Sequence, residues 1–250
     1  MMNDKILEVK NLYKKYYNDD ETKYKYAKNI LTTFSTTNEN EVPMLEKGEY
    51  WSLEDISFSL NKGDSLAILG DRSSGKSLLL KLLTNRLYPD YGTIISPSNS
   101  TVLEELRLGI NGHLSVLENL YLKAALVSIS KKTVLNNIDN ILKFAEFDRD
   151  VLNTQWKYLT SDSKNKIMYS FLVNCKHDFF VVDGLTHIGD TEFANKCKDM
   201  IVQVSEDSTF VIATRHSRKV KHICNKLLIL DKGKMTFFGE IEEGLKNYDS

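Results

Sequence analysis

The sequence contains little cysteine and little proline, and it has no long run of apolar residues. Its three cysteines, Cys175, Cys197 and Cys224, lie far apart and form no Cys-x-x-Cys pair, which argues against both a disulfide framework and a zinc site. A reducing cytosol is the simplest environment for such a chain. No stretch approaches the roughly 18 apolar residues of a membrane span, and the polar N-terminus has no apolar signal core. We therefore expect a protein that neither spans a membrane nor is exported.

The chain also has no strong net charge, because 33 Lys and Arg residues stand against 34 Asp and Glu residues. No electrostatic field therefore marks it as a nucleic-acid binder, and we expect no nucleic-acid partner. At 250 residues the chain is long enough for one large α/β domain, which buries on the order of 75% of its unfolded surface. No second core is required, and the sequence has no internal repeat.

The most informative stretch is Gly-Asp-Arg-Ser-Ser-Gly-Lys-Ser at residues 70–77, which fits the pattern G-x-x-x-x-G-K-[S/T]. A short apolar run at 64–69 precedes it and is typical of a buried strand, and a helical pattern follows at 77–83. Strand, loop and helix thus occur in the order that a phosphate-binding loop needs. The nucleotide-binding residues predicted from this stretch are Gly70, Asp71, Arg72, Ser73, Ser74, Gly75, Lys76, Ser77 and Leu78.

The residue types in this loop suit the binding of a nucleoside triphosphate. The glycines let successive backbone N–H groups curl around phosphates at a helix N-terminus, where the helix dipole favours negative charge. Lys76 would reach the β- and γ-phosphates, and the Ser77 hydroxyl would bind a phosphate-bound Mg²⁺. Asp183, which closes a second apolar run at 179–183, has the character of the carboxylate that completes the magnesium shell. We therefore expect ATP and Mg²⁺ as cofactors.

The first quarter of the chain alternates strand patterns with a polar segment. Residues 6–13 and 51–60 alternate apolar and polar side chains, as half-buried strands do. Residues 18–49 are polar with weak periodicity, apart from a short helical pattern at 26–31, and are expected to be an inserted loop. That loop is either a solvated excursion or a dedicated contact element. The turn at 61–64 predicts a hairpin that leads into the strand before the phosphate loop.

The rest of the chain predicts an α/β core interrupted by helices. Helical periodicity at 116–126 and 134–142 predicts a helical subdomain over about 105–175. Continuous apolar runs at 178–183, 209–213 and 226–230 are typical of a parallel sheet covered on both faces. Further short strands are predicted at 93–95 and 101–103, and residues 231–239 predict a hairpin followed by a short helix. The helices between the apolar strands predict a doubly wound core.

With the loop at 70–77, the strand at 179–183 and a helical insert between them, nearly the whole chain resembles the ATP-binding subunit of ABC transporters. Residues 50–58, 117–119, 183–190 and the pair Lys196-Cys197 are similar to the subgroup that exports O-antigen, capsular polysaccharide or teichoic acid. The resemblance implies a single P-loop NTPase domain of the ABC cassette type over residues 1–250. Its fold class is α/β, with a mostly parallel core sheet, an antiparallel β subdomain and a helical subdomain.

The resemblance also implies roles for single residues and for partners. Tyr16 resembles the aromatic residue that stacks on adenine, although a surface tyrosine would look the same. His216 resembles the switch histidine near the γ-phosphate, which with Asp183 would serve catalysis, against the alternative of a solvated loop histidine. Residues 188–190 match the loop that contacts a second ATP-binding subunit. A polytopic membrane permease is the other implied partner, with this chain cytoplasmic and peripheral on the inner face of the plasma membrane.

Three departures from the family pattern argue against rapid ATP hydrolysis. Gly184 stands where the family has the glutamate that orients the attacking water, and a missing general base typically costs 10²- to 10⁴-fold in rate. His187 is a conceivable substitute for that base. Residues 159–163 occupy the position of the glycine-containing signature that meets the partner's ATP, but Asp162 adds a negative charge there; alternatively this segment simply caps a helix that begins near Asn165. No glutamine lies near Leu106, where Glu105 is the nearest polar residue.

Two functions from different classes follow. The first is the nucleotide-binding subunit of a polysaccharide exporter with impaired hydrolysis. The second is a non-catalytic ATP-binding regulator or structural partner of a competent paralogue. A soluble cassette protein of translation or DNA repair is a further alternative, but the chain lacks the second phosphate loop and the long coiled-coil insert that would support it.

Overall fold

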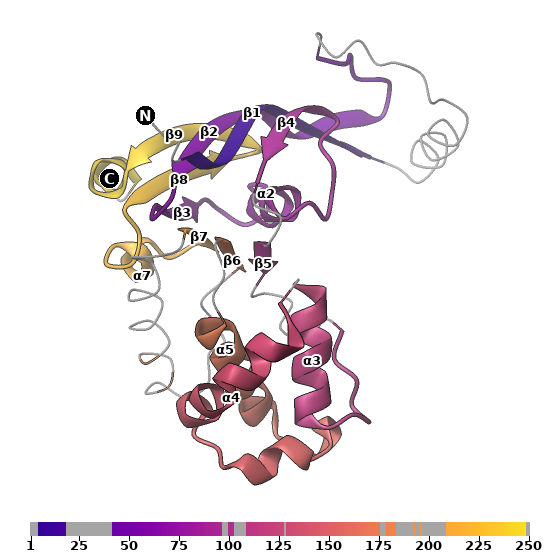
Figure 1. The fold of residues 1–250 in the computed structure, drawn as a ribbon. Coiled ribbons are helices and arrows are strands. Elements are labelled where there is room, and N and C mark those ends of the chain that lie inside the picture. Colours follow the sequence, from indigo (N-terminus) through magenta and orange to yellow (C-terminus); the bar gives the residue numbers. More distant parts are fainter. Residues whose placement is uncertain are drawn as a thin grey trace.

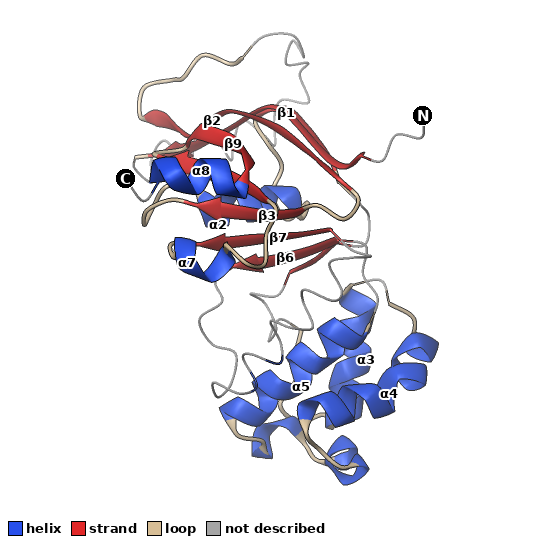
Figure 2. Ribbon diagram, turned by 90° about the vertical axis from the view of Figure 1, so that its left-hand side faces the viewer, coloured by secondary structure: helices blue, strands red, loops and turns tan. Residues whose placement is uncertain are grey.

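The computed structural model describes residues 5–18, 42–96, 100–102, 109–127, 129–175, 179–183, 193, 196 and 209–248. Within these residues the strands form one sheet in the order β4-β1-β2-β9-β8-β3-β7-β6-β5, and helices α3, α4 and α5 lie together apart from it (Figures 1 and 2). The strands are β1 Lys5–Tyr17, β2 Glu49–Asn61, β3 Ser65–Leu69, β4 Tyr91–Ile95, β5 Ser100–Val102, β6 Phe179–Asp183, β7 Thr209–Thr214, β8 Lys226–Asp231 and β9 Lys234–Glu240. The helices are α2 Lys76–Leu83, α3 Val116–Leu126, α4 Lys131–Ala145, α5 Ser161–Asn174, α7 Ser217–Val220 and α8 Ile241–Tyr248, with 3₁₀ turns at Arg149–Asn153 and Trp156–Tyr158.

The sheet has an antiparallel part and a mostly parallel part, as the predicted fold class requires. β1 pairs antiparallel with both β2 and β4. In the other part, β3 pairs parallel with β7 and β8, and β6 pairs parallel with β5 and β7. Every residue of β3 and β7 is buried, because these apolar runs are covered on both faces. The expected cassette architecture is thus confirmed.

The two parts of the sheet meet where β2 lies beside β9. Their parallel pairing has one registered residue pair, Glu54 opposite Lys234. β9 in turn forms an antiparallel hairpin with β8, and α8 follows it directly. The predicted hairpin at 231–239 and the short helix after it are therefore confirmed.

The hairpin predicted at 61–64 is wrong. A turn does lie there, with Gly63 at a φ of 86°. However, β2 and β3 do not pair, since β9 and β8 lie between them in the sheet. The reason is burial: β2 alternates between buried and exposed residues, whereas β3 needs parallel neighbours and covered faces on both sides.

The helical part agrees with the helical periodicity of the sequence. α3 has the predicted bounds, and a capping box begins it, in which Ser115 and Glu118 each bond the other's backbone N–H. α4 extends beyond the predicted 134–142 at both ends, and its cap is Ser130. The three helices share one apolar core with Trp156 and Phe144. The helix predicted at 26–31 lies outside the described residues.

The described helices include none that is both long and apolar enough to cross a membrane.

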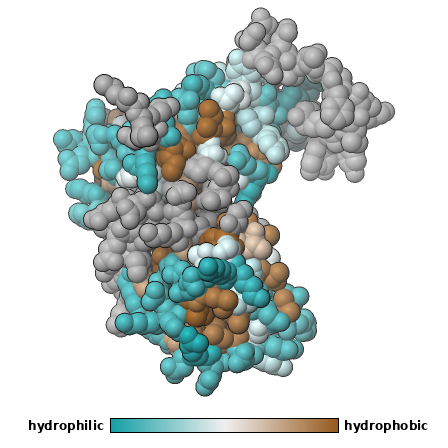
Figure 3. Space-filling model, in the orientation of Figure 1, coloured by the Kyte–Doolittle hydropathy of each residue, from teal (hydrophilic) through white to brown (hydrophobic). Residues whose placement is uncertain are grey.

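On the helical part, Figure 3 shows an area of apolar side chains within a mainly polar surface. The large apolar residues exposed on this part are Leu122 and Leu126 of α3, Leu135 of α4 and Tyr158.

A buried asparagine holds the loop before α3 against the helix. The side chain of Asn119 is fully buried, and its oxygen accepts a bond of 2.8 Å from the backbone N–H of Asn111. Its amide nitrogen donates to the carbonyl oxygens of Asn111, Leu114 and Ser115 at 2.9, 3.2 and 2.9 Å. The three carbonyl oxygens also accept backbone N–H groups, from Leu114, Trp156 and Asn119, whereas the N–H of Asn111 has the Asn119 side chain as its recorded acceptor. One buried side chain therefore connects the loop to the first turn of the helix through four hydrogen bonds.

We predict that Asn119→Ala lowers the free energy of unfolding by about 3 kcal/mol, because it removes four hydrogen bonds of a buried side chain and leaves the N–H of Asn111 without its recorded acceptor. Asn137→Ala is the matched control, since Asn137 lies on the neighbouring helix α4 and its side chain makes one recorded bond, to the carbonyl oxygen of Thr133. That variant should lose no more than about 1 kcal/mol. Urea denaturation measures both, and equal losses would contradict the role given to Asn119.

Candidate functional site

The loop of residues 70–77 lies between the buried strand β3 and helix α2, as the motif predicts. Gly70 is itself buried, and a Cβ atom there would lie 2.6 Å from the Ser74 hydroxyl oxygen and closer still to the carbonyl oxygen of Leu230. Gly75 is the N-cap of α2 in the left-handed conformation, with a φ of 104°. Because glycine has no side chain, none competes at this cap for the first amides of the helix. The loop therefore has the backbone of an anion-binding helix N-terminus.

The ammonium group of Lys76 lies within this loop. Its nitrogen donates to the carbonyl oxygens of Gly70 and Asp71, both at 2.7 Å, and to the Ser74 hydroxyl at 3.2 Å. The loop thus holds a positive charge among its own oxygen atoms. The side chains of Asp71, Arg72, Ser73 and Ser77 are exposed, whereas that of Leu78 packs against the core of the sheet.

Strand register brings Asp183 and His216, which were also predicted as site residues, to the edge of the sheet where the loop of residues 70–77 lies. Asp183, the last residue of β6, lies opposite Ala213 of β7, and Ala213 lies opposite Ile68 of β3. The carboxyl ends of the three parallel strands are therefore level. Gly70 follows two residues after Ile68, and His216 follows two residues after the end of β7. The backbone N–H of His216 donates to the Thr214 hydroxyl at 3.2 Å, and its side chain is exposed.

Tyr16 lies in a different part of the sheet. It is on β1, opposite Tyr50 of β2, and 41% of its surface is exposed. The nearby Tyr13 is more enclosed, because its ring contacts those of Trp51 and Tyr91 edge to face, and burial raises the pKa of its hydroxyl. Of the three tyrosines on β1, Tyr16 is exposed, whereas Tyr13 and Tyr17 are partly buried.

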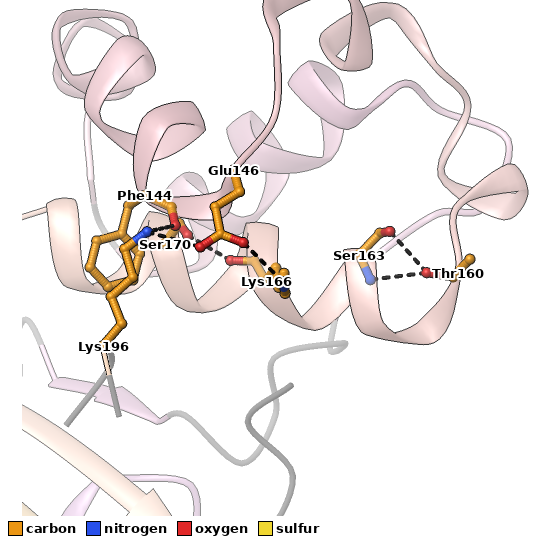
Figure 4. Close-up of polar contacts among 7 residues, drawn as sticks. All are labelled: Phe144, Glu146, Thr160, Ser163, Lys166, Ser170 and Lys196. Carbon is orange, nitrogen blue, oxygen red and sulfur yellow. Dashed lines mark hydrogen bonds and ion pairs between the residues drawn. The ribbon is translucent and has the colours of Figure 1, made fainter. Parts of the chain in front are cut away.

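The segment at 159–163 begins helix α5, which starts at Ser161 and not near Asn165 as predicted. Thr160 is the N-cap, and its hydroxyl oxygen accepts a bond of 3.1 Å from the backbone N–H of Ser163 (Figure 4). Asp162 lies in the first turn with an exposed side chain. The predicted capping role of this segment is therefore confirmed, with Thr160 as the capping residue. The predicted effect of the Asp162 charge on a partner's nucleotide is compatible with that role and stays a prediction.

Further along α5 lies an ion-pair cluster that sequence reasoning missed. Glu146, the C-cap that follows α4, pairs with Lys166 of α5 at 3.0 Å and with Lys196 at 3.2 Å (Figure 4). Hydrogen bonds from the two ammonium groups hold the pKa of the Glu146 carboxyl below its ordinary value. Lys196 also donates to the carbonyl oxygen of Phe144. The bonded pairs are 20 to 52 positions apart in sequence, so no local pattern could have identified them.

Several predicted residues lie outside the described part of the chain. They are Glu105, Gly184, His187 and the loop at 188–190.

A buried strand, a phosphate-binding loop and a helix at the carboxyl edge of a mostly parallel sheet define a P-loop NTPase. The sequence model of the ABC transporter family matches residues 53–187, which is more than half of the chain. The chain therefore belongs to the ABC transporter family, and it has the fold of that family's ATPase cassette.

Similar proteins agree with this assignment. The chain is 28% identical over 209 residues to the teichoic acids export ATP-binding protein TagH of Staphylococcus saprophyticus, covering 83% of this chain and 78% of that relative. It is 31% identical over 204 residues to TagH of Bacillus anthracis, covering 81% of this chain and 37% of that relative. Among solved structures, the dimeric ATP-binding cassette MJ0796 bound to ADP and Pi matches 94% of this chain and 98% of its own with a TM-score of 0.68. At 15% identity, that likeness concerns the fold alone.

The cap of α5 leads to a prediction about stability. Thr160→Ala removes the side-chain acceptor for the Ser163 N–H and should lower the free energy of unfolding by about 1 kcal/mol. Thr160→Ser keeps a capping hydroxyl and should stay within about 0.5 kcal/mol of the parent. Chemical denaturation of the three proteins measures this, and an equal loss in the serine variant would show that the methyl group matters rather than the cap.

Proposed function

We propose that this chain is the ATP-binding subunit of an ABC exporter that moves a polysaccharide, and that residues 1–250 form its single ATP-binding domain. The observation that carries the proposal is the phosphate-binding loop around Lys76, with the carboxyl ends of β6 and β7 level beside it. The loop backbone fits a phosphate chain, because its glycine cap leaves the first amides of α2 without a competing side chain.

In this proposal each residue of the loop has a separate task. The backbone amides of residues 70–78 bind the phosphates. The ammonium group of Lys76 gives up its bonds to the loop carbonyl oxygens and binds oxygens of the β- and γ-phosphates instead. Ser77 and Asp183 hold Mg²⁺, which would neutralise charge on the phosphates when bound. Tyr16 stacks on adenine, and His216 acts near the γ-phosphate.

The exporter assignment rests on the names of the relatives, which are teichoic acids export proteins. In such a system this chain would pair with a second ATP-binding subunit and with a separate polytopic permease, and closure of the subunit pair on Mg-ATP would drive the permease. Leu122 and Leu126, which are 40% and 58% exposed on α3, support a partner surface on the helical part. The chain would then lie in the cytoplasm, peripheral on the inner face of the plasma membrane.

Hydrolysis in the proposed site is direct attack of water on the γ-phosphate, and we propose that it is slow. Gly184 cannot act as a base for that water. The exposed carboxylate of Asp162, at the first turn of α5, adds negative charge where the resemblance implies that a partner's nucleotide is met. These two residues also favour a second candidate function, that of a non-catalytic ATP-binding partner of a competent paralogue.

We predict that saturating Mg-ATP raises the melting temperature of the chain. A ligand at 100 times its dissociation constant adds about 2.7 kcal/mol to the native state, which corresponds to roughly 5–10 °C for a chain of this size. Lys76→Ala should abolish the shift, because the variant loses the ammonium group that binds the phosphates. Lys81→Ala is the matched control, since Lys81 is exposed on the same helix. An undiminished shift in Lys76→Ala would refute the proposed site.

The rate of ATP hydrolysis tests the proposed catalytic defect. We predict that Gly184→Glu raises the turnover number by about 10² or more, because it supplies the missing base. Gly184→Gln is the matched control: it has nearly the same shape but cannot accept the proton, so it should leave the rate low. A steady-state phosphate-release assay measures all three proteins.

Two outcomes of that assay separate the causes of slow turnover. If Gly184→Glu becomes active only when Asp162→Gly is added, closure of the subunit pair was limiting, and the two effects are non-additive. Rapid hydrolysis by the unmodified chain would contradict both the proposed defect and the non-catalytic alternative.

A further inference from the structure

The turn between β8 and β9 contacts the phosphate-binding loop, although the two are far apart in sequence. The backbone N–H of Gly233 donates to the carbonyl oxygen of Ser74 at 3.0 Å. On the other side of the same residue, the carbonyl oxygen of Gly233 accepts a bond of 2.9 Å from the N–H of Glu54 on β2. Gly233 is buried, so it links the loop to β2 from inside the protein.

The close approach of this turn to β2 requires glycine. Gly233 has a φ of 82°, and a Cβ atom there would lie 2.9 Å from the carbonyl carbon of Ser52 and closer still to its oxygen. Both are backbone atoms of a paired strand, so no side-chain rotation could make room for a methyl group. Any larger residue would therefore have to move the turn away from β2.

The same region is where the two parts of the sheet meet. The pair Glu54 opposite Lys234 is the registered contact of β2 with β9, and their side chains form an ion pair at 3.1 Å. The loop contacts the neighbouring residues as well, because Gly70 approaches the carbonyl oxygen of Leu230 and Gly75 approaches the side chain of Leu53. The phosphate-binding loop thus packs directly on the junction of the two sheet parts.

The bond from Gly233 has a consequence for the direction of a loop amide. In a planar trans peptide unit the carbonyl and the following N–H point in opposite directions. Because the Ser74 carbonyl points toward the turn, the N–H of Gly75 points away from it. Gly75 is the cap of α2, where an amide can bind a phosphate oxygen.

We propose that Gly233 is a positioning residue for nucleotide binding, which sets the orientation of the Ser74–Gly75 peptide unit in the phosphate-binding loop. This inference rests on the proposed function, since it assumes that the loop binds Mg-ATP. Gly233 does not touch the nucleotide in this account. It acts through its bond to Ser74 and through its close packing on β2.

The test compares Gly233→Ala with Gly63→Ala. Both residues are turn glycines of nearly equal φ, 82° and 86°, but a Cβ atom at Gly63 meets nothing within 4 Å. The two variants therefore share the strain of a positive φ, but only in Gly233→Ala does the new Cβ meet the backbone of β2, which would push the turn and its bond to Ser74 out of place. We expect Gly233→Ala to raise the dissociation constant for Mg-ATP by about tenfold or more, and Gly63→Ala to leave it within about twofold of the parent.

Isothermal titration calorimetry gives the dissociation constants, and the melting temperature without nucleotide shows that each variant is folded. If the parent chain binds no Mg-ATP, the proposed function fails and the inference fails with it. If the parent binds and the two variants bind equally well, the proposed function stands and the positioning role of Gly233 is wrong.

A second measurement covers the case in which Gly233→Ala does not fold. In the unmodified chain, nucleotide that rigidifies the loop should slow amide hydrogen exchange in a peptide spanning 231–235, since the Gly233 N–H is bonded to the loop. A peptide spanning 61–64 should exchange at an unchanged rate. No slowing at 231–235 under saturating Mg-ATP would overturn the inference.

Discussion

The parallel pairing of β3 with β7, and of β7 with β6, aligns the carboxyl ends of three strands at one edge of the sheet. Because side chains in a parallel sheet advance together along neighbouring strands, the residue that ends β6 is level with Ile68, two positions before the phosphate-binding loop. The burial of β3 and β7 stabilises this register, since a slip by one residue would turn every side chain to the opposite face. The proposed nucleotide site depends on that alignment.

The helical part follows a different physical principle, in which local capping fixes helix starts and ion pairs connect helices. Ser115, Ser130 and Thr160 each accept a backbone N–H at the start of α3, α4 and α5. Glu146 then connects the end of α4 to Lys166 on α5 (Figure 4). The first turn of α5 is thus well ordered by its cap, so the exposed charge of Asp162 belongs to a defined helix start rather than to an irregular loop.

Much of the fold and part of the site could be predicted from the sequence. The loop at 70–77 was found because its residues are contiguous and its geometry is local. The bounds of α3 were predicted correctly because helical periodicity acts over a few residues. The Ser115–Glu118 capping box that the structure shows at its start is equally local. The strand that ends at Asp183 was predicted from a continuous apolar run. The roles of Asp183, His216 and Tyr16 remain predictions, because each concerns a bound nucleotide. The role of Asp183 was inferred from its place at the end of an apolar run, and those of His216 and Tyr16 from family resemblance.

By itself, the sequence determined the elements, the phosphate-binding loop and the family to which the chain belongs, since each depends on patterns within short segments. Only the tertiary structure decided which strands pair. The hairpin predicted at 61–64 was therefore wrong: the turn exists, but the neighbours of β3 in the sheet are β8 and β7, not β2. It likewise decided the contact of Gly233 with Ser74 and the pairing of Glu146 with Lys196. The physical reason is that such contacts depend on how distant segments share one buried volume, and no pattern within a few residues carries that information.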